Sequence, residues 1–327
     1  MADVAVTRRI VAVTRRIIDT SLLQEHHAVR MYEGQGPMSR LELLDFIAGA
    51  DAILSMLGDR VDGEFMDAAG PQLRAIANYA VGFNNIDLAE ANRRQIAIGN
   101  TPDVLTDATA DIAIGLMLAA GRLFGPSVEA VRTHGWRDWD PTGRLGLEFA
   151  GKTAGIIGMG RIGEATAKRL HFGWGMNILY VARSDKPHID RAMQARRVEL
   201  DELLEQADVI SLHCDLNDQT RHLINEQSLA RMKPTAILIN TSRGGVVDQQ
   251  ALHATLAAGK IFAAGLDVTD PEPLPSDSPL RELANCYILP HIGSATYQAR
   301  TAMAHRAAEN ILAALRDEPM PYAVATN

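Results

Sequence analysis

Hydrophobic and polar positions along the chain predict short strands and helices in regular succession. Runs rich in Val, Ile and Ala lie between segments with helical spacing, several of which open with Ser, Thr or Asp. Before residue 100, we expect strands at 28–32, 52–57, 73–81 and 96–99 and helices at 20–26, 39–49, 62–69 and 86–95. This alternation is typical of βαβ units, which build a parallel sheet.

The alternation restarts at Lys152 with more continuous apolar runs, which are typical of strands buried on both faces. These runs predict strands at 153–159, 177–182, 207–214, 236–241, 261–268 and 286–289. Between the two halves, Asp103–Leu123 predicts one long buried helix, followed by a loop that contains Trp136 and Trp139. The fold class is therefore α/β, with two doubly wound parallel sheets of Rossmann or flavodoxin type. A long Ala-rich helix at 296–316 is expected to return to the first half.

The N-terminus contains a short duplication, because Ala5–Ile10 and Ala12–Ile17 have the same sequence. Two copies are too few for a repeat architecture, which needs about three or more. We interpret the second copy as the first strand and the first copy as an extension that precedes it.

Length and composition exclude several classes of protein. The 327 residues allow two domains, and 47% hydrophobic with 22% charged residues is typical of globular proteins. Two cysteines cannot form a disulfide framework, which favours a reducing, cytoplasmic location. The most apolar stretch, Ile112–Gly121, is too short for a membrane span, and a net charge of -8 offers no basic face for nucleic acid.

A glycine-rich turn follows the strand predicted at 153–159. Gly158, Gly160 and Gly163 have the spacing G-x-G-x-x-G, and a helical run begins directly afterwards. In such a turn the glycines permit a tight bend, close approach of a pyrophosphate and close packing of the helix on the strand. The helix N-terminus then faces the phosphates. Because the motif lies between a strand and a helix, it predicts a dinucleotide site.

The end of the next strand predicts which dinucleotide binds. An acidic residue there is typical of NAD sites, and an arginine is typical of NADP sites. Here Arg183 and the hydroxyl of Ser184 occupy this place, and Asp185 follows. The sequence thus favours NADP(H), with NAD(H) as the alternative because Asp185 could also turn toward the ribose.

Three later strand ends carry Arg243, Glu272 and His291. Ligands of open α/β sheets bind beyond the carboxyl ends of the strands, so these side chains are expected near the nicotinamide. Histidine is a suitable proton donor to a carbonyl, a carboxylate stabilises its charged form, and arginine binds a substrate carboxylate. Each residue alone is often only structural, but the set predicts reduction of a small 2-keto acid. No cluster with metal-ligand spacing occurs in the sequence.

Six motifs in order resemble the D-isomer-specific 2-hydroxyacid dehydrogenases over residues 10–320. They lie at Val81–Asp87, Asn100–Asp111, Gly155–Gly163, Asn240–Asp248, Asp267–Pro273 and Leu289–Thr296. Within that family, the run from Asn100 to Thr106 and the loop from Gly135 to Pro141 look most like glyoxylate/hydroxypyruvate reductases.

The resemblance implies roles for the matching positions. Arg243, Glu272 and His291 match the catalytic residues, and the backbone of Val81 and Gly82 matches a turn that binds the substrate carboxylate. The matching cofactor positions are Thr109, Gly158, Gly160, Arg161, Ile162, Gly163, Cys214, Thr220, Thr241, Ser242, Asp267 and Gly293. The family also implies a homodimer held largely by the cofactor domain and by the arm at 105–150. Its layout gives a substrate-binding domain of residues 1–103 and 293–327 and a dinucleotide-binding domain of residues 104–292.

Two departures from the family pattern affect these expectations. Asp215 replaces a proline that is common after His-Cys, and Gly143 lies near a position where animal hydroxypyruvate reductases have a tryptophan. Other 2-keto acids, including 2-ketogluconate, therefore stay open as substrates. A protein of a different class, a nicotinamide-sensing binding protein without catalytic activity, is the remaining alternative.

Overall fold

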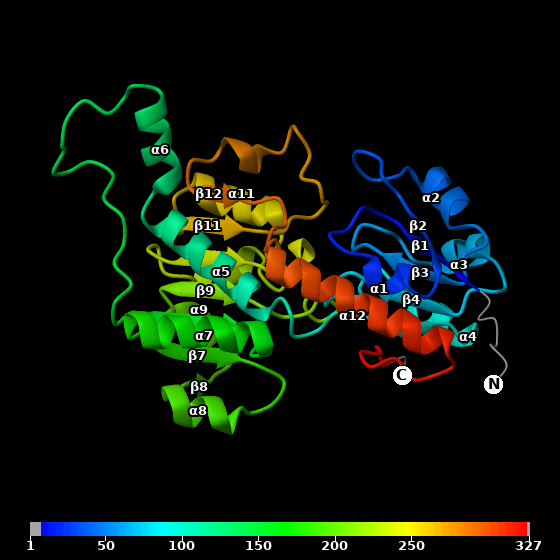
Figure 1. Cartoon of the computed structure of the whole chain (residues 1–327). Coiled ribbons are helices and arrows are strands. Elements are labelled where there is room, and N and C mark those ends of the chain that lie inside the picture. Colours follow the sequence, from blue (N-terminus) through cyan, green and yellow to red (C-terminus); the bar gives the residue numbers. More distant parts are fainter. Residues whose placement is uncertain (1–7, 326–327) are drawn as a thin grey trace. The chain divides into compact units, whose positions relative to one another are not determined.

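The computed structural model describes residues 8–325 and divides the chain into two compact units (Figure 1). One unit consists of Met1–Leu105 together with Ala295–Asn327, and the other consists of Thr106–Ser294. Each unit contains a parallel sheet with helices on both faces. The expected doubly wound α/β class is confirmed, and so is the return of the last helix to the first half of the chain.

The first unit contains a five-stranded parallel sheet in the order β2-β1-β3-β4-β5. β2 lies on one side of β1, and β3, β4 and β5 lie on the other side, so the direction in which strands are added to the sheet reverses after β2. The strands are β1 (Ile10–Val13), β2 (Ala28–Met31), β3 (Ala52–Ser55), β4 (Ala75–Asn78) and β5 (Ala97–Gly99).

Helices cover both faces of this sheet. Ile53 and Ile76 belong to a hydrophobic cluster with α2 (Arg40–Ile47), α3 (Gly63–Ala69) and α4 (Leu88–Arg93). Two further helices, α1 (Ser21–Gln24) and α12 (Tyr297–Leu315), pack against each other outside this cluster. Gly99 faces α12, since an added Cβ would lie 2.4 Å from Nδ2 of Asn310. The absence of a side chain at Gly99 therefore lets α12 approach β5 closely.

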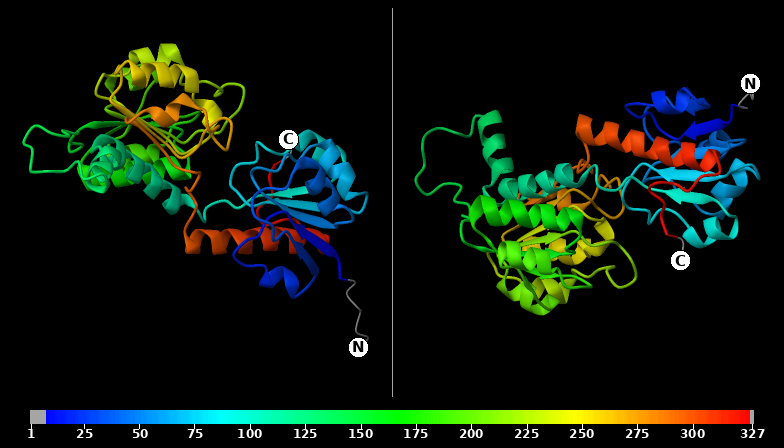
Figure 2. Two further views of the ribbon diagram at one scale, coloured as in Figure 1. Left: turned by 90° about the horizontal axis from the view of Figure 1, so that it is seen from above. Right: turned by 60° about the horizontal axis from the view of Figure 1, so that its bottom comes forward.

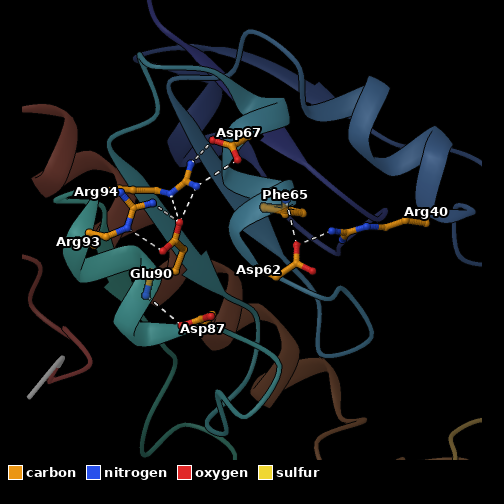
Figure 3. A network of polar contacts seen from close by, with 8 residues as sticks. All are labelled: Arg40, Asp62, Phe65, Asp67, Asp87, Glu90, Arg93 and Arg94. Atoms are coloured by element: carbon orange, nitrogen blue, oxygen red, sulfur yellow. Dashed lines mark hydrogen bonds and ion pairs between the residues drawn. The ribbon is translucent and has the colours of Figure 1, made fainter.

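Aspartate side chains cap the N-termini of two helices of this unit (Figure 3). The Phe65 N–H donates to Asp62 at the N-terminus of α3, and the Glu90 N–H donates to Asp87 at the N-terminus of α4, each at 3.0 Å. Such caps satisfy backbone donors that the helix itself leaves unpaired. Asp62 also accepts a hydrogen bond from Arg40 of α2, so the same carboxylate links two helices.

Ion pairs continue from α4 to α3. Nε of Arg94 donates to Glu90 at 2.7 Å, and the same guanidinium binds Asp67 of α3 (Figure 3). Hydrogen bonds from Arg93 and Arg94 lower the pKa of Glu90 to about 2. The carboxylate of Glu90 therefore stays charged far into the acidic range.

The second unit contains a seven-stranded parallel sheet in the order β12-β11-β10-β9-β6-β7-β8. In six of its strands every side chain except that of Asn177 is buried or half-buried, and the two-residue edge strand β8 is exposed. The strands are β6 (Thr153–Ile157), β7 (Asn177–Val181), β8 (Arg196–Arg197), β9 (Val209–Leu212), β10 (Ile237–Asn240), β11 (Ala263–Leu266) and β12 (Cys286–Ile288).

Two hydrophobic clusters lie on the two sides of this sheet, which Figure 2 shows between its helical layers. One cluster joins the strands to α5 (Thr106–Gly121), α7 (Arg161–Trp174) and α8 (Pro187–Met193). The other joins them to α9 (Leu200–Gln206), α10 (Glu226–Arg231) and α11 (Gln249–Ala257). Alternate residues of one strand serve the two clusters, as Ile237 and Leu238 of β10 do.

The interpretation of the N-terminal duplication was wrong. The first strand, β1, begins at Ile10, the last residue of the first copy, and ends at Val13, the second residue of the second copy. Residues 1–7, which include the start of the first copy, lie outside the described residues. The strand follows the continuous apolar run Ile-Val-Ala-Val, because that run can be buried between β2 and β3 and the Arg-Arg pairs cannot.

The helix expected at Asp103–Leu123 is present as α5, which spans Thr106–Gly121, but the loop expected after it begins with a further helix. Leu123 has a φ of 54°, and α5 ends before it. A second helix, α6 (Phe124–Arg132), begins there and bends away by 66°. Of the described helices, none is long and apolar enough to cross a membrane alone, although α5 and α6 taken together pass that test of length and composition.

Candidate active site

The glycine turn after β6 has the geometry that close approach requires. Gly158 has a φ of 96°, and an added Cβ would lie 2.6 Å from the backbone of Cys214. At Gly163, an added Cβ would lie 2.2 Å from the carbonyl oxygen of Gly158, so only glycine lets α7 pack on this turn. Around Gly160 nothing lies within 4 Å of an added Cβ, which leaves the space above that backbone open.

The N-terminus of α7 can hold a phosphate. Gly160 precedes the helix with extended backbone and no side-chain cap, and Arg161 and Ile162 form the first turn. The backbone N–H groups of this 14-residue helix and its dipole attract anions. Together with the open space at Gly160, these residues fit the pyrophosphate of a dinucleotide.

Arg183 and Ser184 lie exposed in the turn after β7. Asp185 pairs with neither of these residues but with Arg197 of β8, whose Nη1 lies 2.8 Å from Oδ1 of Asp185. Lys186 follows in the same turn, and its backbone N–H donates to Oη of Tyr180 at 3.1 Å. The turn therefore exposes the guanidinium of Arg183 and the hydroxyl of Ser184, while its one carboxylate, that of Asp185, forms an ion pair with Arg197.

The turn after β9 carries His213, Cys214 and Thr220. The hydroxyl of Ser211 lies 2.9 Å from Nε2 of His213, and the hydroxyl of Thr241 lies 3.4 Å from Nδ1. Burial lowers the pKa of this imidazole to about 3. Burial also raises the pKa of the Cys214 thiol to about 11, so the thiol is protonated at neutral pH. The hydroxyl of Thr220 donates to the carbonyl of Asp215 at 2.6 Å and closes the loop.

Arg243 follows β10 in a turn that the buried side chain of Asn240 holds. Oδ1 of Asn240 accepts from the N–H and the hydroxyl of Ser242, and Nδ2 donates to the carbonyl of Arg243 at 2.9 Å. Thr241 and Ser242 are buried in the same turn. Burial lowers the pKa of the Arg243 guanidinium against the opposing charges of Glu272 and Asp215.

The turns after β10, β11 and β12 touch one another. An added Cβ on Gly244 would lie 2.0 Å from the carbonyl of Thr269, and one on Gly293 would lie 2.9 Å from Oδ2 of Asp267. Thr109 of α5 is also buried at this edge, and its hydroxyl donates to the carbonyl of Gly293 at 3.2 Å. The structure thus brings together the three strand ends that carry Arg243, Glu272 and His291.

His291 and Glu272 form a direct pair. Nδ1 of His291 lies 2.8 Å from Oε2 of Glu272, and Oε1 of Glu272 accepts from the Thr269 N–H at 3.0 Å. Burial would raise the pKa of Glu272, but the bond and charge of His291, the Thr269 N–H and the charge of Arg243 outweigh it and lower that pKa. A stably charged carboxylate on Nδ1 favours an imidazole that can carry and release a proton at Nε2.

Asp267 holds the backbone next to the histidine. Its two carboxylate oxygens accept from the N–H groups of Ile292 and Gly293, both at 2.8 Å, and the side chain is fully buried. Burial raises the pKa of Asp267, and these two hydrogen bonds oppose that effect. His291 itself has a φ of 54°, a backbone conformation that costs energy for a residue with a side chain.

A cavity of about 650 Å³ opens beside this pair. Asp267, Glu272 and His291 form one part of its wall, and Leu274, Ile288 and Leu289 form an apolar part. A ligand in this cavity would therefore meet a proton donor and an apolar surface.

Val81 and Gly82 lie in the first unit, in a turn after β4. Nδ2 of Asn100 donates to the carbonyl of Val81 at 2.7 Å, and Nδ2 of Asn78 donates to the carbonyl of Gly82 at 2.8 Å. These two asparagines fix the turn. Sequence reasoning missed both of them as well as Asn240, although each ends or follows an apolar strand, where a buried amide is needed to hold a turn.

A model of the NAD binding domain of D-isomer specific 2-hydroxyacid dehydrogenases matches residues 114–293. The chain is 44% identical to a glyoxylate reductase of Korarchaeum cryptofilum over 96% of this chain and 95% of that relative. It is also 44% identical to the glyoxylate reductase/hydroxypyruvate reductase of Homo sapiens, over 98% and 97% of the two chains.

Solved structures have the same fold. The crystal structure of an NADPH-dependent glyoxylate/hydroxypyruvate reductase from Sinorhizobium meliloti, in complex with NADP and malonate, matches with a TM-score of 0.82, 29% identity and 98% coverage of both chains. A glyoxylate reductase from Paecilomyes thermophila matches with a TM-score of 0.85 and 32% identity, over 97% of this chain and 98% of that one.

The fold and the site therefore define an oxidoreductase that uses a nicotinamide dinucleotide. The chain belongs to the D-isomer specific 2-hydroxyacid dehydrogenase family.

Proposed function

We propose that this enzyme reduces glyoxylate and hydroxypyruvate to the corresponding 2-hydroxy acids with NADPH. The observation that carries the proposal is the 2.8 Å contact between Nδ1 of His291 and Glu272, in the same group of strand ends as Arg243. The names of relatives at 44% identity support glyoxylate and hydroxypyruvate as the substrates.

Each of the three residues has one task in this proposal. When bound, the nicotinamide supplies the hydride that reduces the carbonyl carbon. His291 donates a proton from Nε2 to the carbonyl oxygen, and Glu272 stabilises the protonated imidazole. Arg243 binds the substrate carboxylate and polarises the adjacent carbonyl. We also assign substrate binding to the backbone of Val81 and Gly82, because these residues match the turn that binds the substrate carboxylate in the family.

The cofactor contacts follow the turns of the second unit. We assign the pyrophosphate to the backbone at Gly158–Gly163, including Arg161 and Ile162, because this turn is open at Gly160 and lies at a helix N-terminus. We assign the remaining contacts to Thr109, Cys214, Thr220, Thr241, Ser242, Asp267 and Gly293. Residues 104–292 are thus the dinucleotide-binding domain, and 1–103 with 293–327 are the substrate-binding domain.

A preference for NADPH over NADH is supported by the exposed Arg183–Ser184 pair and by the ion pair that occupies Asp185. An arginine can bind a 2′-phosphate through two parallel hydrogen bonds. Arg183→Ala should raise the Michaelis constant for NADPH far more than that for NADH. Equal effects on both would contradict the assignment.

A homodimer is supported by the second unit's arm. In α6 no side chain is buried, and Phe124, Val128 and Val131 are exposed, as are Trp136 and Trp139 beyond it. The ribbon of α6 and the loop beyond it projects from the second unit in Figure 1 and Figure 2. Exposed apolar side chains in such a segment are typical of an interface. Light scattering at micromolar concentration should give twice the mass of one chain.

Larger 2-keto acids, including 2-ketogluconate, are the second candidate substrates. The cavity of about 650 Å³ beside His291 has room and an apolar wall for a substrate bulkier than glyoxylate. A panel of 2-keto acids, followed by loss of nicotinamide absorbance with NADPH and with NADH, ranks the candidates by kcat/KM. Glyoxylate and hydroxypyruvate with NADPH should lead; absence of turnover with every 2-keto acid would favour a nicotinamide-sensing protein instead.

A further inference from the structure

We propose that Arg197 is a positioning residue that sets the choice of cofactor by holding Asp185 away from the dinucleotide. The inference rests on the proposed preference for NADPH and names a residue, outside the glycine turn and Arg183, on which that preference depends. Arg197 lies in β8, the edge strand of the seven-stranded sheet.

Arg197 binds both ends of the segment that contains Arg183 and Ser184. Its Nε donates to the carbonyl of Ala182 at 3.0 Å, and its guanidinium donates to Oδ1 of Asp185 at 2.8 Å. The backbone places it there, because Arg197 pairs with Tyr180 in the register of β7 and β8. One side chain thereby fixes the two residues that flank Arg183 and Ser184.

The position of β8 in the sheet gives the direction of Asp185. The strand order is β6-β7-β8, and the glycine turn follows β6. A carboxylate bound to Arg197 is directed toward β8, and therefore toward the side of β7 that lies away from the glycine turn. An acidic residue that serves an NAD ribose must instead face the dinucleotide at the end of β7.

A second anchor fixes the far end of the turn. Oη of the fully buried Tyr180 accepts from the Lys186 N–H at 3.1 Å and donates to Asp190 at 2.9 Å. With Arg197 on one side and Tyr180 on the other, Arg183 and Ser184 are presented to solvent by a turn that is held at both ends. Preorganisation of this kind lowers the entropic cost of binding a phosphate.

Removal of Arg197 changes the charge that a 2′-phosphate meets. Asp185 is the single carboxylate between Ala182 and Ile189, and without its partner it would repel the phosphate and could accept hydrogen bonds from a ribose. Since both side chains are solvent-exposed, Asp185 more than Arg197, the pair contributes little to folding stability, and variants of either residue should fold.

Dissociation constants of NADPH and NADH, measured by fluorescence titration without a keto acid, test the inference separately from catalysis. Arg197→Ala should raise the dissociation constant for NADPH about tenfold and lower that for NADH about threefold, shifts that correspond to small changes in binding free energy. Arg196→Ala is the matched control, since Arg196 is the neighbouring exposed residue of β8 and pairs with Glu202 at 3.2 Å. The control should bind both cofactors as the wild type does.

The double variant Arg197→Ala with Asp185→Asn separates the two ways in which Arg197 could act. If Arg197 acts through Asp185, removal of the carboxylate charge restores most of the affinity for NADPH. If the double variant does not recover, Arg197 contacts the phosphate itself and the positioning role is wrong. Equal effects of Arg197→Ala and Arg196→Ala would also overturn it.

The same dissociation constants distinguish an error in the proposed NADPH preference from an error in the role of Arg197. Wild-type protein that binds NADH more tightly, with no effect of Arg183→Ala, would overturn the NADPH preference and the inference that depends on it. Wild-type protein that prefers NADPH, with an unchanged preference in Arg197→Ala, would overturn the role of Arg197 alone.

Discussion

Glu272 lies 2.8 Å from Nδ1 of His291, although 19 positions separate the two residues in the chain. The turn after β11 brings them together, because Oε1 of Glu272 also accepts from the backbone N–H of Thr269. One carboxylate oxygen thus anchors the side chain, and the other faces the imidazole. The pair is therefore fixed before any substrate arrives.

Glu272→Gln should narrow the pH range of the reductive reaction. The wild-type pKa of Glu272 is lowered despite burial, so its carboxylate is charged throughout the neutral range and stabilises the imidazolium. An amide removes that charge but retains the shape. We expect the alkaline limb of kcat/KM for reduction to move to lower pH, with the rate of the reverse oxidation less affected. Superimposable pH profiles of wild type and variant would contradict the role of Glu272.

Asp267→Asn should loosen the turn that carries His291. Both oxygens of Asp267 accept backbone N–H groups, and an amide offers only one oxygen and places an NH₂ against the second donor. The loss of one buried hydrogen bond to a charged acceptor is worth about 2 kcal/mol. We expect a fall in kcat at saturating NADPH and a lower thermal midpoint. Unchanged kcat with a lowered midpoint would restrict Asp267 to a structural role.

Gly160→Ala and Gly163→Ala form a matched pair in one turn. At Gly163 an added Cβ meets the Gly158 carbonyl at 2.2 Å, and overpacking of this kind costs about 1–3 kcal/mol, more than the roughly 1 kcal/mol that alanine gains in a helix. At Gly160 nothing lies within 4 Å and φ is -85°, so alanine is tolerated in the fold but intrudes on the phosphate. Urea unfolding should be weakened only by Gly163→Ala, whereas Gly160→Ala should weaken NADPH binding in a stably folded protein. Wild-type affinity in Gly160→Ala would exclude this turn as the pyrophosphate site.

Glu90→Gln should reduce the stability of the first unit in a manner that depends on pH. The pKa of Glu90 in the folded protein, about 2, lies below the ordinary glutamate value of 4.5, so Glu90 stabilises the folded state above about pH 4.5 and loses that contribution as pH falls toward 2. Urea unfolding should show a larger difference between variant and wild type at pH 7 than at pH 3. Glu309→Gln, an exposed change on α12, is the control and should show no such trend. A difference that is constant with pH would contradict the ion pairs around Glu90.

The alternation of apolar runs was sufficient to predict the succession of strands and their parallel arrangement. Strands such as Ile237–Asn240 are buried on both faces, so their residues are nearly all apolar and easily recognised. The break between α5 and α6 could not be predicted, because it depends on the left-handed backbone at Leu123 and on a helix with no buried face. Apolar periodicity carries no information on such a helix.

The candidate site was predictable to the extent that its residues follow strands directly. Arg243, Glu272 and His291 come after β10, β11 and β12, so topology alone brings them to one edge of the sheet. The contact between Arg197 and Asp185 was not predictable, because it depends on the register of a two-residue edge strand that no pattern marks. The same holds for Asp267, whose bonds to Ile292 and Gly293 arise from the packing of two turns.

In the proposed reaction, His291 donates the proton while NADPH supplies the hydride. Single-turnover oxidation of enzyme-bound NADPH by glyoxylate, compared between wild type and His291→Ala, measures the contribution of His291 to this step alone. NADPH binding should be retained in the variant, and the rate should fall by roughly 10²–10⁴-fold, the usual contribution of a general acid. A variant that binds NADPH and oxidises it at the wild-type rate would show that His291 is not the proton donor.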